Sequence, residues 1–408
     1  AAIALLWLIP RTAWARQAAG DWIAEATGLP STVDSLRIGF FPRPVLEVDG
    51  LAIAQPAGFG ADPLLTIGSA RVSAPWGSLF GGSALDSIAL VDATLRPALA
   101  ADGADNWAGV IEQLAALGGE GPAAWSIGRL DVERGAVEFH DAATGSRWRL
   151  TAITIVAEGL APKVEFPVEL RLAGVAGAIT FHLALNGRGR ADPDAGRYEA
   201  HTLGIRGWAG GEPLPLAGVE LAGALERASF DLALGRTTFE RGSFNLAGIP
   251  GAFAATMSAA DPAAQLEFSV QIDTFAPRAP AIAFGFPLPA TADPQAFQLL
   301  QLSLAGRAQD GQLQLDPIAG QLDDTQFEGR AIPAERLIRA TLDRIDLNRY
   351  LAPEQKKARQ KRATLEAAIA QLAGYDIDAE IRIGEARVAG ATLRDAVIRV
   401  ERDLGGAP

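Results

Sequence analysis

Few residues in this sequence could carry covalent or metal chemistry. Its 408 residues include no Cys and three His, at positions 140, 182 and 201. Without Cys, disulfide frameworks, Cys-ligated zinc, iron–sulfur clusters and thiol catalysis are excluded. His140 and His201 have no Ser or acidic partner at a motif spacing, and His182 falls on the polar side of an alternating run, which predicts that it faces solvent.

The acidic pairs are also poor candidates for a site. A calcium site needs six to eight oxygen ligands, and neither Asp192 with Asp194 nor Asp323 with Asp324 lies in a repeated acidic spacing. Turns or protection of sheet edges explain these pairs better. The sequence contains no G-x-S-x-G, P-loop, H-E-x-x-H or dinucleotide-binding fingerprint. We therefore expect a protein that is not an enzyme and needs no cofactor or metal.

Composition narrows the class further. Net charge is −12, from 36 basic and 48 acidic residues, which argues against a nucleic-acid partner. Apolar residues make up 49% of the chain, which is too many for intrinsic disorder. What remains is a folded protein that must remove a large amount of apolar surface from water.

Alternation of apolar and polar residues predicts strands along most of the chain. The clearest run is 265–273, in which every second residue is apolar. On the order of twenty such runs occur. Turns are expected between runs where residues that tolerate a left-handed backbone meet Gly, at Asp49-Gly50, Arg134-Gly135, Asn186-Gly187 and Asp310-Gly311.

Helices are expected in only three places. These are residues 11–27, with Trp14, Ala18, Trp22 and Ile23 on one face, residues 105–117, capped by Asp105 or Asn106, and residues 353–373. So few helices cannot supply the crossovers of a parallel sheet, so we predict a mostly-β protein with a long antiparallel sheet. The Pro-rich run 277–294 is the candidate loop or joint.

A sheet of this size leaves two architectures open. Open sheets rarely exceed ~10 strands without curling, splitting or closing, and here few helices are available to cover the apolar face. The sheet either packs on another sheet as a sandwich, or curls into a trough whose apolar lining needs an apolar occupant such as acyl chains. Periodicity alone favours the sandwich.

An ordered set of motifs favours the trough. In chain order these are Thr27-Gly28, Phe41-Pro42-Arg43-Pro44, Gly58-Phe59, Leu79-Phe80-Gly81-Gly82, Asp102-Gly103 with Asn106-Trp107, then QLDDTQFEGR (321–330), DRIDLNRYLAP (343–353) and the strand region 376–400. This set resembles proteins of the AsmA family of Gram-negative bacteria. The resemblance implies a β-rich periplasmic protein, anchored in the inner membrane and grouped with chorein-type bridge-like lipid transfer proteins.

From that resemblance we expect a curled sheet that forms an apolar groove and handles phospholipids in outer-membrane biogenesis. Implied partners are phospholipids, the inner membrane and envelope proteins. The alternative is a structural or assembly subunit of a membrane complex with a closed β-sandwich core. The candidate groove-lining residues are Leu46, Val48, Leu51, Ile53, Leu130, Val132, Leu170, Leu172, Ile179, Phe181, Leu183, Leu266, Phe268, Val270, Ile272, Leu302 and Leu304.

Two further features concern membranes. The first ten residues, AAIALLWLIP, are interpreted as the end of an anchor, although a span needs ~20 residues, and Arg11 and Arg16 argue weakly against a periplasmic chain behind it. A basic cluster could contact anionic headgroups, although a solvated helix face is the simpler interpretation. Its residues are Lys356, Lys357, Arg359, Lys361 and Arg362.

The expected organisation has four parts. Residues 1–27 are the end of the anchor and the N-terminal helix, and 28–120 are the N-terminal β region with a short helix. Residues 121–351 are the central β-groove region, and 352–408 are a helix and the start of a C-terminal β region.

Overall fold

The computed structural model of the protein describes ten stretches of the chain. They are residues 13–80, 83–117, 125–142, 144–212, 218–258, 265–284, 288–309, 312–351, 378–388 and 390–400. The chain divides into two compact units at Pro213 and Leu214 rather than in the Pro-rich run 277–294. In each unit the described strands form an open sheet, with few and short helices.

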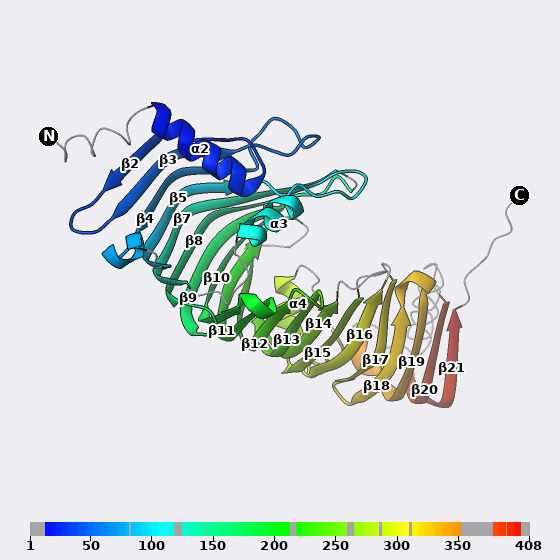
Figure 1. The fold of residues 1–408 in the computed structure, drawn as a ribbon. Helices are drawn as coiled ribbons and strands as arrows, with labels where there is room; N and C mark the ends of the chain where they lie inside the picture. The colour runs from blue at the N-terminus through cyan, green and yellow to red at the C-terminus, as the bar shows by residue number, and fades with distance from the viewer. Residues whose placement is uncertain are drawn as a thin grey trace, which may run out of the picture. The chain divides into compact units, whose positions relative to one another are not determined.

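The first unit opens with helix α2 (Ala13–Thr27), which lies along the first strands (Figure 1). Among the described residues of this unit there are also the helix α3 (Ala108–Leu117) and the short 3-10 helices η2 (Trp76–Phe80) and η3 (Pro193–Ala195). Its strands are β1 (Ser31–Thr32), β2 (Ser35–Gly39), β3 (Val45–Ile53), β4 (Leu65–Ser73), β5 (Ala84–Leu95), β6 (Ala98–Leu99), β7 (Ser126–Asp141), β8 (Arg147–Leu160), β9 (Glu165–Ala176), β10 (Ile179–Asp192) and β11 (Arg197–Gly210).

The second unit has the helices α4 (Arg278–Ala283), η4 (Pro333–Glu335) and α5 (Leu347–Tyr350). Its strands are β12 (Val219–Asp231), β13 (Arg236–Leu246), β14 (Ile249–Ser258), β15 (Gln265–Phe275), β16 (Leu300–Gln309), β17 (Gln312–Leu322), β18 (Thr325–Ile332), β19 (Leu337–Asp346), β20 (Asp378–Val388) and β21 (Ala391–Val400). The expected mostly-β class with an N-terminal helix is confirmed.

Most neighbouring strands are antiparallel, as expected, but the sheet is mixed. The pairs β5–β7, β6–β7 and β19–β20 are parallel. A parallel pair needs a connection long enough to bring the chain back to the same end of the sheet. Residues 96–125, which include α3, provide it for β5 and β7, and residues 347–377 provide it for β19 and β20.

Three of the predicted turns are wrong, because they lie inside long strands. Gly50 has φ of +65° within β3, Arg134 has φ of +52° within β7, and the pairing register shifts between Asn186 and Arg188 of β10. A β-bulge accepts the same left-handed backbone as a turn, so the sequence signal does not separate the two.

Residues with a left-handed backbone bend the strands of the first unit. Asp92 of β5 and Arg134 of β7 both have positive φ, and Arg134 donates two hydrogen bonds to the Asp92 carboxylate at 2.7 and 2.8 Å. At Arg134 the register of β7 against β8 also shifts, and such a bulge bends its strand and increases its twist. This explains the curl of the strands visible in Figure 1.

The helices pack differently from the sequence expectation. Helix α2 packs through small residues, of which Ala15 and Gly20 are buried, while Trp14 and Trp22 are 71% and 68% exposed. In α3 the backbone N–H groups of Trp107 and Ala108 donate to Asp105, which confirms Asp105 as the cap. The predicted helix 353–373 lies outside the described residues.

Asn106 has a different role from capping. Its side chain is 1% exposed, accepts a hydrogen bond from the backbone N–H of Ala98, and donates to Gln55 and to the Arg96 carbonyl. It therefore joins the β3–β4 connection to the segment before α3 as a satisfied, buried polar group. This supports a structural interpretation of the Asp102-Gly103 and Asn106-Trp107 motif.

Gly50 allows a test of the left-handed position in β3. A Cβ atom there would lie 2.0 Å from Oδ2 of Asp34, and the backbone conformation is left-handed. We expect Gly50→Ala to destabilise the first unit by about 2 kcal/mol and to speed amide hydrogen exchange in β3. Gly39→Ala in β2 is the control, since its Cβ meets no atom closer than 4.0 Å. Unchanged exchange in β3 would contradict a position that only glycine tolerates.

Candidate functional site: an apolar groove

One face of the first unit's sheet is lined by apolar side chains in cross-strand rows. Directly paired residues of neighbouring strands point to the same face of a sheet, so the register fixes the rows. One row runs from β2 through the successive partner strands to β11. Its members are Leu36, Val48, Ala70, Leu90, Val132, Ile155, Leu170, Leu185 and Ile205.

The candidate residues of the first unit all lie on this face. Leu46 and Leu130 are joined through Val72 and Ile88 in the neighbouring row. Leu172 of β9 and Ile179, Phe181 and Leu183 of β10 fall on the same side by alternation along their strands. Alternation in β3 shifts by one residue at Gly50, which has a left-handed backbone. Ile53 is nevertheless in one row with Phe181, through Leu65, Leu95, Val137, Leu150 and Gly174, and Leu51 lies two residues before Ile53.

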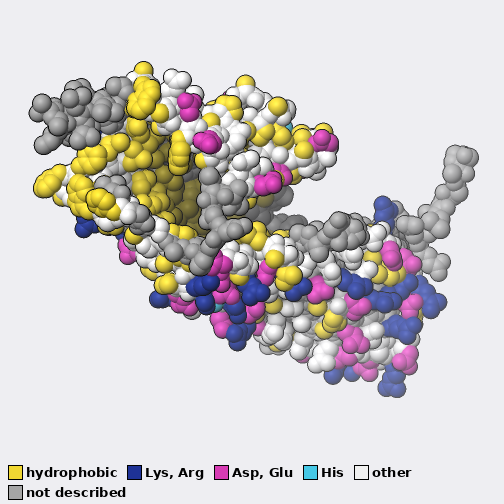
Figure 2. Space-filling model, viewed as in Figure 1, with side chains coloured by type: hydrophobic (Ala, Val, Ile, Leu, Met, Phe, Trp, Pro, Cys, Tyr) yellow, Lys and Arg dark blue, Asp and Glu magenta, His cyan; other side chains and the backbone are white. Residues whose placement is uncertain are grey.

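This apolar face is only partly covered. Of its candidate residues Ile53 is buried, most are half-buried, and Leu46 is 37% exposed. Only sixteen apolar residues are buried in the described part of the chain, a small core for so many strands. Figure 2 shows the hydrophobic side chains gathered in a hollow of the first unit. The face is therefore the floor of an open groove and not one half of a dry sandwich core.

The second unit repeats the arrangement. Its candidates Leu266, Phe268, Val270 and Ile272 alternate along β15 and pair with Ala308, Gly306, Leu304 and Leu302 of β16. One complete row consists of Leu225, Gly242, Phe253, Val270, Leu304, Ile318, Gly329, Ala340, Ile381 and Ile398. The sheet of this unit thus also has one apolar face.

The opposite face of each sheet carries charge. Arg129 of β7 pairs with Glu158 of β8 in the first unit, and Arg241 of β13 pairs with Glu226 of β12 in the second, all with exposed side chains. Figure 2 shows acidic and basic side chains mixed over the strands of the second unit. His182, predicted to face solvent, is exposed. Such surface pairs contribute little stability but keep this face in water.

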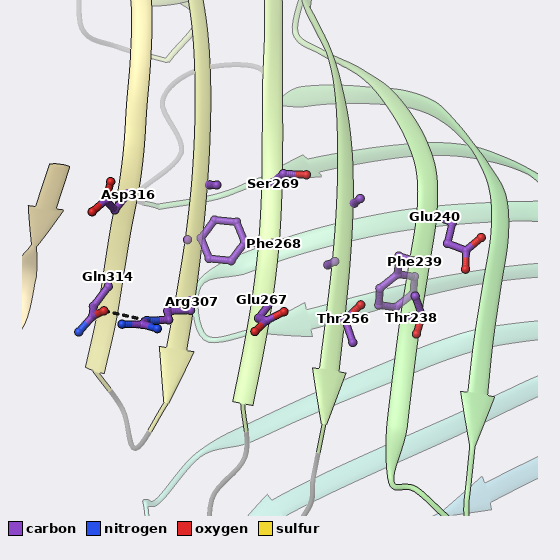
Figure 3. Close-up of a pocket in the computed structure, with 14 residues that line it drawn as sticks. Thr238, Phe239, Glu240, Thr256, Glu267, Phe268, Ser269, Arg307, Gln314 and Asp316 are labelled. Atoms are coloured by element: carbon purple, nitrogen blue, oxygen red, sulfur yellow. Dashed lines mark hydrogen bonds between the residues drawn. The ribbon is translucent and has the colours of Figure 1, made fainter. Parts of the chain in front are cut away.

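A shallow pocket of about 670 Å³ lies over β13–β17 of the second unit (Figure 3). Glu267, Arg307 and Gln314 lie in one cross-strand row there, and Arg307 donates to Gln314 at 2.8 Å. No His lies among the lining residues to activate the hydroxyls of Thr238, Thr256 or Ser269. The lining residues therefore offer carboxylates but no His base beside these hydroxyls.

Asp323 organises the segments that carried the later part of the family resemblance. It sits between β17 and β18 with φ of +50° and is buried. Its carboxylate accepts hydrogen bonds from the backbone N–H groups of Phe297, Gln298 and Leu299 at 2.8, 2.9 and 3.1 Å, and from the Tyr350 hydroxyl at 2.9 Å. The predicted turn role of this residue is confirmed.

Arg349 completes this cluster. It pairs with Asp293 at 2.7 Å and with Asp324, so that the segments 321–330 and 343–353 hold the connection before β16 between them. Burial alone would raise the pKa of Asp323, but the hydrogen bonds from Phe297, Tyr350 and their neighbours lower it below the ordinary value. Burial and the carboxylate raise the pKa of Tyr350. The cluster is a structural clamp of the second unit.

The depressed pKa of Asp323 makes the clamp pH-dependent. Its charged form stabilises the fold at pH values above the ordinary Asp pKa of ~3.9. This contribution is lost as the pH falls through the lower pKa that Asp323 has in the folded protein. At pH 7 we expect Asp323→Ala to lower the free energy of unfolding by about 3 kcal/mol and Tyr350→Phe by about 1 kcal/mol.

Urea unfolding at pH 7 and pH 3 measures these changes. The loss from Asp323→Ala should shrink at the lower pH, because the wild-type carboxylate then loses its advantage. Asp324→Ala is the control, since the Asp324 side chain is 80% exposed and its removal should change stability little. An equal loss for Asp323→Ala at both pH values would contradict a charged clamp.

Several predicted features lie outside the described residues. They are the interpretation of residues 1–10 as the end of an anchor and the basic cluster Lys356, Lys357, Arg359, Lys361 and Arg362. Among the helices in the described ranges, none combines the length and apolar character that crossing a bilayer requires. Nor do three or more acidic or His side chains of the described ranges converge as a metal site would need.

Comparison with known proteins adds no relative. No protein family, curated protein or solved structure matches the chain. The functional argument therefore depends on the groove itself and on the motifs in the sequence.

Proposed function

We propose that this protein binds phospholipids and passes them along its apolar groove, with the acyl chains on the groove floor and the headgroups in water. One observation carries the proposal. The apolar face of each unit continues over neighbouring strands, yet most of the described candidate side chains on it stay half-exposed. A contiguous apolar surface of this extent is unfavourable in water and marks a site for an apolar partner.

The energetics suit a passage. Removing a CH₂ group from water contributes about 0.8 kcal/mol, so a sixteen-carbon chain fully shielded by the groove gains roughly 12 kcal/mol over water. The acyl chain comes from a bilayer interior of similar polarity, so the net change in free energy when it enters the groove is small. Weak net binding favours movement, because a deep energy minimum would trap the lipid.

The motifs that resemble the AsmA family support the same proposal and add a setting. With them we propose a family member that is periplasmic, anchored in the inner membrane of a Gram-negative bacterium and active in outer-membrane biogenesis. The mechanism requires no catalytic residue, cofactor or metal. A structural or assembly subunit is the competing class, and for it the apolar face would be covered by protein instead of lipid.

The first experiment identifies what occupies the groove. The full chain is purified without detergent, and its bound molecules are extracted and analysed by mass spectrometry. We expect phospholipids in stoichiometric amounts, together with transfer of fluorescent phospholipid between donor and acceptor liposomes. Protein free of lipid and inactive in transfer would overturn the proposal.

Substitutions within single strands test which face binds. Phe181→Glu in the first unit and Phe268→Glu in the second put a carboxylate on the groove floor, where a charge has no partner. We expect each to reduce bound lipid by about tenfold, equal to ~1.4 kcal/mol. The matched controls His182→Glu and Ser269→Glu change the next residue of the same strand, which is exposed on the charged face. Equal effects of both sets on native mass spectra would contradict binding in the groove.

A further inference from the structure

A recurring pair of residues lies on the apolar face of both units. Six Phe residues each stand directly opposite a Gly of the neighbouring antiparallel strand. The pairs are Phe166 with Gly189, Phe181 with Gly174, Phe244 with Gly251, Phe253 with Gly242, Phe268 with Gly306 and Phe327 with Gly320.

In each pair the ring lies over the backbone of its glycine. A Cβ atom built on Gly174 would be 2.3 Å from Cζ of Phe181, and one on Gly242 would be 2.3 Å from Cε1 of Phe253. Gly174 and Gly242 are buried although they have no side chain, while both rings are half-exposed. The rings therefore cover the glycines with one side and leave the other side open.

Figure 3 shows the same geometry for Phe268. Its ring is seen face-on, between its own strand and the strand that carries Arg307, in a view that looks onto the sheet. Gly306 precedes Arg307 on that strand, and a Cβ there would lie 2.6 Å from Cζ of Phe268. The ring therefore lies along the sheet instead of standing upright on it.

This geometry changes the depth of the groove. Side chains on a strand normally stand roughly perpendicular to the sheet, so a Phe on the floor would project into the space above it. Glycine inside a strand is unfavourable, and at these six positions a large ring occupies the room beside it. A Phe opposite a residue with a Cβ would have to rise from the floor.

We propose that the six Phe–Gly pairs set the depth of the groove, by keeping aromatic rings flat so that a linear acyl chain meets an even floor. This inference rests on the proposed lipid function and specifies it. The ligand is a long unbranched acyl chain lying along the floor, and the glycines are the positioning residues that hold the rings down.

A purely structural role is the alternative. Aromatic rings stabilise strand glycines by covering them, and that benefit needs no ligand. The two roles differ in a double substitution. Removing both the glycine and the ring restores a low floor but loses the aromatic cover. If the rings set the depth, the double variant should therefore transfer lipid faster than the single glycine variant while it is the less stable protein.

Gly174 and Gly242 suit this test because the three nearest atoms to an added Cβ all belong to the ring. We expect Gly174→Ala and Gly242→Ala to raise the rings and slow phospholipid transfer between liposomes by about fivefold or more. Two double variants should restore transfer although they unfold at lower temperature. They are Gly174→Ala with Phe181→Ala, and Gly242→Ala with Phe253→Ala. Gly39→Ala is the control, since Val45, at 4.0 Å, is the nearest residue that its added Cβ would meet apart from its chain neighbours.

A further variant leaves every glycine in place. Leu170 of β9 faces Ile155 and Leu185, which have side chains of their own. Leu170→Phe therefore adds a ring that cannot lie flat, and we expect slower transfer with little change in the circular dichroism spectrum. This variant also replaces the glycine variants if they fail to fold.

The outcomes separate the two proposals. If the wild-type protein neither holds nor transfers phospholipid, the proposed function fails. If the wild type transfers lipid while folded Gly174→Ala, Gly242→Ala and Leu170→Phe match its rate, only the inference about depth is overturned. Double variants that transfer as slowly as the single glycine variants, in step with their loss of stability, would overturn it in favour of the structural role.

Discussion

The structure depends on an apolar sheet face that the described part of the chain does not cover. In a sandwich that face would be removed from water by a second sheet, at about 25 cal/mol for each Å². Here the described core is small, and side chains such as Leu46 and Phe181 keep contact with solvent. The fold is held by backbone pairing between long strands and by contacts within the face.

Features that keep the sheet open and curled recur on many strands. Residues with a left-handed backbone inside strands, such as Asp92 and Arg134, lie on neighbouring strands and bend them. Phe–Gly pairs fill the floor without raising it, and exposed ion pairs such as Arg129 with Glu158 hold the other face in water.

The Asp323 clamp illustrates how buried charge is used in this protein. Desolvation alone would make its carboxylate unfavourable, but three backbone N–H groups and the Tyr350 hydroxyl compensate for it. The clamp ties the connection before β16 to the β17–β18 hairpin and to α5. Conspicuous acidic motifs in the sequence therefore serve the scaffold, while the candidate binding surface consists of unremarkable aliphatic and Phe residues.

The sequence by itself determined the strands, their apolar face and the cap of α3, because period-two alternation and capping chemistry are local. It did not separate the left-handed positions inside strands, at Asp49-Gly50 and Arg134-Gly135, from turns, since both need the same backbone. Only the tertiary structure decided that the sheet stays open, that β5 pairs in parallel with β7, and that Phe181 lies on Gly174. Those outcomes depend on which strands become neighbours, and pairing register between distant segments is not encoded in any short stretch of residues.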